Sequence, residues 1–196
     1  GIIERMMALI FQRLLGKTLN VPFERLPYSE AMDRFGLDKP DLRFGMELVE
    51  ISDILKDSNF AVFRKPLDSG GIVKAMKVEN GDRLSRKDLD ELRDFAAIYG
   101  GKGVAYARLK DGLEWQSPIA KFLSEEERAA IVERTKASVG DVLLFGADSF
   151  KIVNDVLGNL RNFLAQKLGE IQEDTFKFLW VTEFPMFEYD EDEKRF

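Results

Sequence analysis

The architecture of this chain can be traced most directly from residues 141–168, DVLLFGADSFKIVNDVLGNLRNFLAQKL. The first part, Asp141–Ala147, is a short and mostly apolar run, which is typical of a buried strand. From Ser149 to Leu168 the apolar residues recur at helical spacing, and Gly169 ends the pattern. The apolar positions of this helix are Val153, Val156, Leu157, Leu160, Leu164 and Leu168. A strand followed by a long amphipathic helix predicts a fold that combines both kinds of element.

Strands are also predicted upstream of this stretch, where apolar and polar residues alternate with a period of two. The segments that alternate in this way are Met46–Ile51, Phe60–Arg64 and Ile72–Val78, with a turn at Gly70-Gly71 before the last of them. Two shorter strands are expected at Val104–Leu109 and at about Glu114–Gln116.

Helices are predicted from apolar spacing and from their start and stop residues. Ser85 with Asp88, and Ser124 with Glu127, have the spacing of a capping box. They predict helices that end at Tyr99 and at about Arg134. Two further helices are expected at residues 2–15 and at Tyr28–Phe35, the second stopped by Gly36.

Both ends of the chain are rich in apolar residues, although terminal segments often have few neighbours to cover them. The helix over residues 2–15 is apolar on most of its circumference and expects partners on most sides. Residues 176–189, FKFLWVTEFPMFEY, predict an aromatic-rich strand region that should be buried, followed by a charged turn at Asp190–Arg195. A turn after a core strand normally leads into a partner strand, so both ends are expected to belong to a larger protein.

Composition removes several classes of chemistry. The chain has 196 residues and a net charge of −6, and it contains neither cysteine nor histidine. Disulfide bonds, thiolate nucleophiles, Cys/His zinc sites and triads that need an imidazole base are therefore excluded. Any bound metal would be a hard cation held by oxygen ligands. No apolar run approaches the roughly 20 residues of a membrane helix, and the first residues lack the features of a secretory signal.

Several polar motifs invite a functional interpretation, and each also has a structural one. Gly100-Gly101-Lys102-Gly103 lacks the spacing of a phosphate loop, so a helix-to-strand turn is favoured. Glu125-Glu126-Glu127 suits the first turn of a helix better than a cation site. Residues 190–193, all acidic, are expected in a solvated turn rather than around Mg²⁺. A phosphate-binding patch is less favoured than scattered surface charges for Lys74, Lys77, Arg83, Arg86 and Lys87.

Asp38-Lys39-Pro40-Asp41-Leu42-Arg43 is the most informative polar motif. Pro40 restricts its own backbone and that of Lys39, which would hold four charges in a defined arrangement. The alternative is a charged linker with local ion pairs, and from physical arguments alone this alternative is favoured.

The longer run FGLDKPDLRFG, residues 35–45, resembles the turn that bacterial-type aspartyl-tRNA synthetases carry in their catalytic domain. That family usually has Ser at the position of Leu37. Further blocks that resemble the family, in the same order and covering nearly the whole chain, are Tyr28–Met32, Ser117–Glu127, Asp141–Phe145 and Phe178–Glu188.

The resemblance implies an α+β architecture in three segments. Residues 46–147 would be the GAD insertion domain, a two-layer, DCoH-like unit with an antiparallel sheet and helices that is shared with an amidotransferase subunit. Residues 1–45 and 148–196 would be pieces of a class II synthetase catalytic domain, the second one supplying the return helix and strand. Such flanks would explain the apolar ends, because their core would lie mostly outside this chain.

The resemblance also implies an aspartate–tRNA ligase as the parent protein. In that family the carboxylate of aspartate attacks the α-phosphate of ATP, with Mg²⁺ assisting, and gives aspartyl-adenylate and pyrophosphate. The aspartyl group then passes to the ribose 3′-hydroxyl of the terminal adenosine of tRNA. The implied partners are aspartate and the aspartate tRNA, with the asparagine tRNA left open. The parent would be a cytoplasmic homodimer that does not associate with membranes.

The resemblance places no catalytic residue in this chain. The family's motifs for dimerisation, ATP and the adenylate are expected before Gly1 or after Phe196. The fragment alone is therefore expected to be inactive and to bind neither ATP nor Mg²⁺. Lys39, Arg43 and Lys121 are predicted to contact tRNA or another domain, because they lie near prolines in the best-matched blocks. The alternative is a free-standing RNA- or protein-binding GAD module, which the catalytic-domain flanks argue against.

Overall fold

The computed structural model describes residues 1–187 and 194–195, and its larger sheet is antiparallel and has five strands. Its strands are β2 (Leu48–Glu50), β3 (Ile72–Val78), β4 (Ala105–Leu109), β5 (Trp115–Gln116) and β6 (Val142–Asp148). Their order across the sheet is β2-β3-β6-β4-β5, and every neighbouring pair is antiparallel. The α+β class with an antiparallel sheet is thereby confirmed.

The central strand β6 contributes side chains to two separate cores. Leu143 and Phe145 belong to one buried cluster, whereas Val142 and Leu144 belong to another. Successive side chains of a strand point to opposite faces, so the two clusters lie on opposite faces of the sheet. A strand that is buried on both faces needs the near-continuous apolar run that this segment has.

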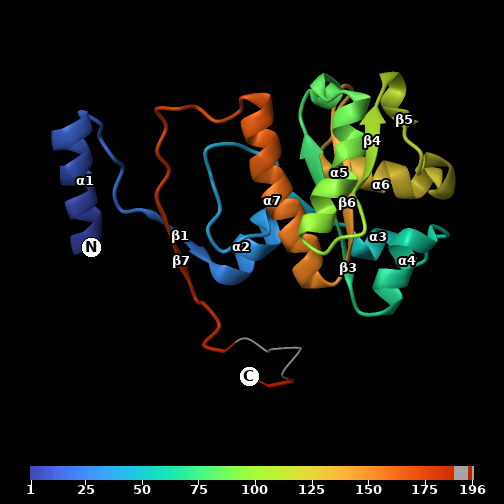
Figure 1. Ribbon diagram of the computed structural model, residues 1–196, viewed down its shortest axis with the longest axis horizontal. Helices are drawn as coiled ribbons and strands as arrows, with labels where there is room; N and C mark the ends of the chain where they lie inside the picture. The colour runs from blue at the N-terminus through green and yellow to red at the C-terminus, as the bar shows by residue number, and fades with distance from the viewer. Residues whose placement is uncertain (188–193, 196) are drawn as a thin grey trace.

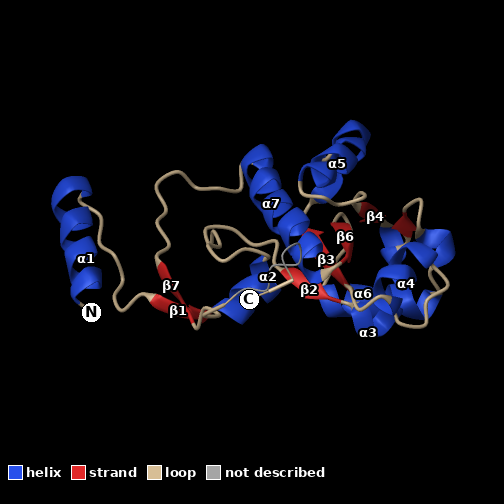
Figure 2. Cartoon of the chain, turned by 60° about the horizontal axis from the view of Figure 1, so that its bottom comes forward, coloured by secondary structure: helices blue, strands red, loops and turns tan. Residues whose placement is uncertain are grey.

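Helices cover both faces of the sheet, as Figure 2 shows. One face carries α3 (Ser52–Leu55), α4 (Ala61–Asp68) and α6 (Glu125–Thr135). The other carries α5 (Arg86–Ile98) and α7 (Phe150–Leu168). The two-layer arrangement expected for the insertion domain is therefore wrong, because the sheet is the middle of three layers. The expectation failed because α5 brings Leu89 and Leu92 to the face opposite α4 and α6.

The prediction of a strand at Phe60–Arg64 is wrong, because this segment forms the start of helix α4. A strand would have placed Val62 on the same face as Phe60. Instead Phe63 is buried with Phe60, and Val62 is exposed. The spacing of Phe60, Phe63 and Leu67 is helical, and the burial of this helical set determines the element.

A smaller unit contains the first part of the chain and its last strand. It comprises α1 (Ile2–Leu15), β1 (Glu24–Pro27), α2 (Tyr28–Phe35) and β7 (Leu179–Thr182). Strands β1 and β7 form a separate parallel pair, and α1 lies at the end of the molecule away from the five-stranded sheet (Figure 1). Local pattern does not predict β1, because Pro22 precedes it, Pro27 is its last residue, and prolines are typical of loops. Its main-chain partner is about 155 residues away, which local pattern cannot reveal.

The ends of the chain are more exposed than the sequence predicts. Strand β7 has only four residues, and Phe176, Phe184 and Phe187 are exposed, so the expected burial of the aromatic region is wrong among the described residues. In α1 the buried residue is Glu4, which accepts hydrogen bonds from the backbone of Phe23 and the indole of Trp180. Residues 190–193 of the predicted charged turn lie outside the described residues. Among those that are described, no helix has both the length and the apolar character needed to cross a bilayer.

Candidate functional site

The end of α2 packs directly against the backbone of α7. Gly36, at φ 71°, ends α2 in the left-handed conformation that favours glycine. A Cβ atom on Gly36 would lie 2.6 Å from the carbonyl oxygen of Asn154, and one on Gly158 would lie 2.8 Å from the carbonyl oxygen of Phe35. Two glycines on the facing segments therefore allow this close approach, which positions the loop over residues 36–47 beside α7.

Arg161 of α7 holds this loop through main-chain oxygens. Its guanidinium donates hydrogen bonds to the carbonyl oxygens of Asp41 (2.7 Å), Phe44 (2.8 Å) and Gly45 (3.0 Å). The residue is only 1% exposed, and Cζ lies 4.1 Å from the centre of the Phe44 ring. Burial lowers the pKa of Arg161 to about 10, a value at which it is still protonated at neutral pH. A buried cation thus fixes the conformation of the DKPDLR segment.

Asp41 and Arg43 form an ion pair within the loop. The Arg43 side chain donates to both carboxylate oxygens of Asp41, at 2.6 Å from Nη2 to Oδ2 and 3.0 Å from Nε to Oδ1. This hydrogen-bonded guanidinium holds the pKa of Asp41 below its usual value. Both interpretations of the motif are thus partly right: local ion pairing occurs, and it occurs in a loop whose shape α7 holds.

Lys74 of β3 is a second buried cation that contacts α2. It is 0% exposed, and its ammonium donates to the Asn154 side chain at 3.0 Å and to the carbonyl oxygen of Asp33 at 2.9 Å. The Asp33 carboxylate lies 3.7 Å away. Burial lowers the pKa of Lys74, and the charge of Asp33 opposes this shift. Lys74 therefore connects the sheet to α2, and Arg161 connects α7 to the loop over residues 36–47.

The three predicted contact residues do not form one site. Lys39 is exposed beside the buried Pro40, whereas the Arg43 side chain is engaged by Asp41. Lys121 is exposed in a 3-10 turn at Ala120–Phe122, with its ammonium 4.9 Å from the ring centre of Phe122. That ring stacks on Phe60, on the face of the sheet opposite α7. Lys39 and Lys121 are therefore separate surface cations.

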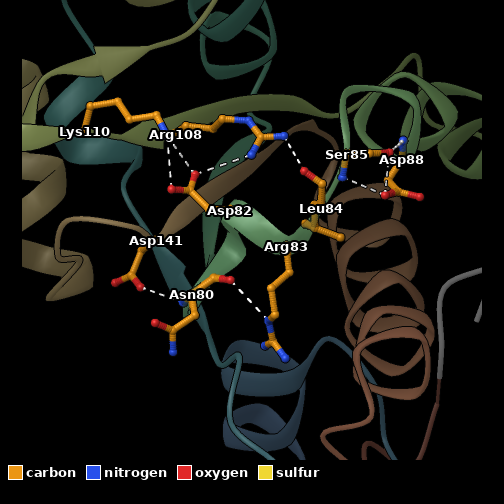
Figure 3. Close-up of polar contacts among 9 residues, drawn as sticks. All are labelled: Asn80, Asp82, Arg83, Leu84, Ser85, Asp88, Arg108, Lys110 and Asp141. Atoms are coloured by element: carbon orange, nitrogen blue, oxygen red, sulfur yellow. Dashed lines mark hydrogen bonds and ion pairs between the residues drawn. The ribbon is translucent and has the colours of Figure 1, made fainter.

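A polar network surrounds the 3-10 turn at Gly81–Arg83, as Figure 3 shows. The Asp82 carboxylate accepts from Lys110 at 3.0 Å and from Arg108 at 3.5 Å, and these bonds, that of Lys110 above all, lower the pKa of Asp82. Arg108 also donates to the carbonyl oxygen of Leu84. Asp141 accepts from the backbone of Asn80. The network links the start of α5 to β4.

The predicted capping boxes are present in α5 and α6. Ser85 accepts from the backbone of Asp88 at 3.1 Å, and Ser124 does the same for Glu127 at 3.1 Å. Asp88 is also paired with Lys167, and these contacts hold its pKa well below its usual range. The acidic run Glu125–Glu127 thus lies in the first turn of α6, as the structural interpretation predicts.

The other sequence motifs follow their structural interpretations. Gly100 and Gly101 form the turn between α5 and β4, where a Cβ on Gly101 would lie 2.8 Å from Val156 Cγ2. The basic residues form no single patch, since Lys77 pairs with Glu79 and Arg83 pairs with Glu170. For Lys74, which is buried, the expected surface position is wrong. Within residues 1–187 and 194–195, no group of three acidic side chains is placed to hold a metal ion. The acidic residues 190–193 lie outside the described residues.

Sequence reasoning did not identify the roles of Arg161 and Lys74, although a signal was present. Arg161 follows Leu157 by four residues and precedes Leu164 by three, which places a charge on the apolar face of the helix. Lys74 shares the inward face of β3 with Met76 and Val78. A charge within an apolar stripe predicts a buried, hydrogen-bonded group.

Comparison with known proteins gives consistent matches along the chain. The family described as the GAD domain matches residues 63–157. The chain is 50% identical over 196 residues to an aspartate–tRNA(Asp/Asn) ligase of Desulfatibacillum aliphaticivorans, covering 100% of the chain and 33% of that protein. It is 50% identical over 194 residues to the ligase of the same name from Syntrophotalea carbinolica, covering 99% of the chain and 33% of the relative. The chain is 48% identical over 194 residues to the ligase of the same name from Aquifex aeolicus, covering 98% of the chain and 32% of the relative. The chain therefore spans about a third of the length of these relatives.

Proposed function

We propose that this chain, which carries a GAD domain and is related along its whole length to aspartate–tRNA ligases, is a non-catalytic part of such a ligase. The observation that carries the proposal is the identity of 50% over all 196 residues, including both flanks of the GAD match. In the whole protein, the carboxylate of aspartate would attack the α-phosphate of ATP, which gives aspartyl-adenylate and releases pyrophosphate, and the aspartyl group would then pass from the adenylate to tRNA.

We further propose that residues 46–147 are an insertion between two segments of the catalytic domain, 1–45 and 148–196. The parallel pairing of β1 with β7 supports this division, since it joins the two flanks to each other. So does a third apolar cluster, which consists of Leu26, Ala31 and Phe35 with Leu42, Leu179 and Val181. Helix α7 would connect the units, because it packs on the sheet and holds the 36–47 loop through Arg161.

No step of the reaction is assigned to residues of this chain. The described residues offer no converging set of carboxylates suited to Mg²⁺, and the buried cations Lys74 and Arg161 are directed at main-chain carbonyls. ATP and Mg²⁺ would act in the remaining two-thirds of the ligase. The proposed role of this segment is to support the catalytic domain and to contact tRNA, with Lys39, Arg43 and Lys121 as candidate contacts. The whole ligase is proposed to be a cytoplasmic homodimer.

Aminoacylation by a full-length ligase that contains this sequence tests the proposal. The intact enzyme should charge the aspartate tRNA, and the chain alone should show no aspartate-dependent ATP–pyrophosphate exchange. Replacing residues 46–147 by a short Gly/Ser linker should raise the KM for tRNA while adenylate formation from aspartate persists. Exchange activity in the isolated chain would contradict the assignment of a non-catalytic role.

A free-standing RNA- or protein-binding GAD module is the second function class, and the same experiment separates it. If the protein that carries this sequence neither forms aspartyl-adenylate nor charges tRNA, the ligase proposal fails in favour of a binding module. The flanks argue for the ligase, because residues 1–62 and 158–196 lie outside the GAD match yet share the identity with the ligases.

A further inference from the structure

A cavity of about 530 Å³ lies between the start of α5 and the edge of the sheet at β4 and β5. Its polar lining consists of Arg86, Tyr106, Arg108, Gln116 and Ser117. Small-molecule sites in proteins have volumes of roughly 300–1,000 Å³, so this cavity has the size of a ligand site. It is lined by two arginines and no carboxylate, in a chain whose net charge is −6.

The strand register brings the lining residues together. Arg108 of β4 is paired directly with Gln116 of β5, and directly paired residues project to the same face of a sheet. Tyr106 precedes Arg108 by two residues and shares that face. Ala107 and Leu109, which alternate with them, are buried in the cluster on the opposite face. Tyr106, Arg108 and Gln116 are thus held on strands of the sheet.

The two arginines of the cavity differ in how they are held. Arg108 is only 14% exposed, and its guanidinium is fixed between the Asp82 carboxylate and the Leu84 carbonyl (Figure 3). Asp82 also binds Lys110, so two cations share one carboxylate and a positive charge remains. The Arg86 side chain is 90% exposed, and its nearest carboxylate, that of Asp90, is 4.0 Å away. One cation is therefore preorganised and the other is available to a ligand.

The cavity also carries polar groups without partners. Within the part of the chain that the structure describes, neither the Tyr106 hydroxyl nor the Gln116 amide has a hydrogen-bond partner. An aromatic ring can stack on a base, a glutamine amide can both donate to and accept from a base edge, and arginine pairs with phosphate oxygens. These three capacities converge in one place.

We propose that this cavity binds a nucleotide, with Arg86 and Arg108 contacting the phosphate and Tyr106 and Gln116 contacting the base. The nucleotide can be free or can be a unit of a single-stranded RNA, and both present the same phosphate and base. The inference rests on the cavity alone and does not depend on the ligase assignment. It concerns residues other than Lys39, Arg43 and Lys121.

Fluorescence anisotropy of a short labelled single-stranded RNA with the 196-residue chain tests the site. Unlabelled AMP and inorganic phosphate serve as competitors, and thermal melting verifies that each variant is folded. Arg86→Gln should weaken RNA binding about tenfold, the usual effect of removing a charge-assisted hydrogen bond. Gln116→Ala, which changes no charge, should weaken it about threefold.

Lys87→Gln is the matched control for Arg86→Gln. Both residues lie in the first turn of α5, are exposed (86% for Lys87, 90% for Arg86) and have a carboxylate four residues on, at 3.8 and 4.0 Å. Only Arg86 lines the cavity. Lys87→Gln should therefore change the affinity by less than about twofold.

Each alternative result overturns or supports the site. Displacement of the RNA by AMP supports a free nucleotide as ligand, and binding of RNA without displacement by AMP supports a strand. Equal losses of RNA affinity in Arg86→Gln and Lys87→Gln would indicate non-specific electrostatic attraction by the surface charges, and would overturn the proposal. It would also be overturned if nothing bound, or if inorganic phosphate displaced the RNA at the same concentrations at which AMP displaces it. Loss of this site with normal aminoacylation would leave the ligase proposal intact, so the two can fail separately.

Discussion

The guanidinium carbon of Arg161 lies 4.1 Å from the ring centre of Phe44, in the loop whose carbonyl oxygens the same guanidinium binds. The Arg161 guanidinium thus packs on the Phe44 ring and also donates hydrogen bonds to three carbonyl oxygens of the same loop. No carboxylate is hydrogen-bonded to this buried cation among the described residues, although Asp41 and Glu47 raise its pKa against the larger effect of burial. The loop conformation and the charge of Arg161 therefore depend on each other.

Arg161→Met should lower the free energy of unfolding by about 3 kcal/mol, because three main-chain carbonyl groups lose their donor. Arg161→Lys should also be destabilising, since an ammonium cannot reproduce the planar, stacked fork. Urea denaturation measures both. Arg64→Met, at an exposed arginine of α4, is the control and should change stability by less than about 0.5 kcal/mol. Equal effects at the two positions would contradict the anchoring role.

Gly158→Ala offers a test in which two effects have opposite signs. Helix propensity alone predicts that alanine stabilises α7 by about 1 kcal/mol. The new Cβ, however, would lie 2.8 Å from the Phe35 carbonyl oxygen and 3.0 Å from the Gly36 carbonyl carbon, both backbone atoms. We expect a net loss of about 1–3 kcal/mol. Gly45→Ala, where a Cβ has open space, should be nearly neutral; stabilisation by Gly158→Ala would show that α2 does not pack here as described.

Lys74 should make stability depend on pH in the alkaline range. Burial lowers its pKa in the native state below the value of about 10.4 expected in the unfolded chain. Between the two values the unfolded chain holds a proton that the native protein releases, so the free energy of unfolding rises with pH. Below the native pKa both states are protonated, and the full cost of burying the charge is present.

Lys74→Met and Lys74→Arg both remove this ionisation, and urea midpoints measured across the alkaline range test it. The free energy of unfolding of the wild type, relative to either variant, should increase with pH by at most about 1.4 kcal/mol per unit within that window. A constant difference between wild type and both variants would contradict a lowered pKa at Lys74.

The capping box of α5 should make the free energy of unfolding depend on pH in the acid range, through Asp88. The Lys167 and Ser85 contacts depress the pKa of Asp88, so its stabilisation is present above the unfolded pKa and is lost as pH falls through the native pKa. Asp88→Asn and Ser85→Ala should each cost about 1 kcal/mol near neutral pH. The cost of Asp88→Asn, followed by thermal melting, should shrink below pH of about 4. Asp90→Asn, further along the exposed side of α5, is the control.

Lys39→Glu and Lys121→Glu should each raise the KM for tRNA in the full-length ligase and reduce its dependence on salt, if these cations meet the tRNA backbone. The two losses should add, because the residues lie on different faces of the sheet. Lys56→Glu, at another exposed lysine, serves as the control. Unchanged KM values in both variants would remove Lys39 and Lys121 as contacts.

Local patterns predicted most elements of this fold and left specific gaps. Ile72–Val78, both capping boxes and the glycine stop of α7 were confirmed, because each depends on residues within a few positions of one another. Phe60–Arg64 was mistaken for a strand, since five residues cannot separate a period of 2 from one of 3.6 when Phe60, Val62 and Phe63 are all apolar. Strand β1 was missed because its partner β7 is remote.

For the candidate site, the sequence indicated the DKPDLR motif but did not indicate that Arg161 binds it. The DKPDLR segment was singled out from its proline and its charges, and an ion pair between Asp41 and Arg43 is present. That Arg161 holds the segment depends on a contact across 120 positions of the chain. Likewise, the pairing of Arg108 with Gln116 required a register that the two-residue strand β5 does not specify by pattern.

The amino-acid sequence alone established the α+β class, the helix boundaries that caps define, the absence of thiol and imidazole chemistry, and the resemblance to a synthetase family. These follow from composition and from interactions between near neighbours, which every short segment carries with it. The three-layer arrangement, the parallel β1–β7 pair and the burial of Lys74 and Arg161 were determined by tertiary packing. They arise from contacts between distant segments, where the desolvation of a charge is compensated only once the carbonyl groups of another segment are in place.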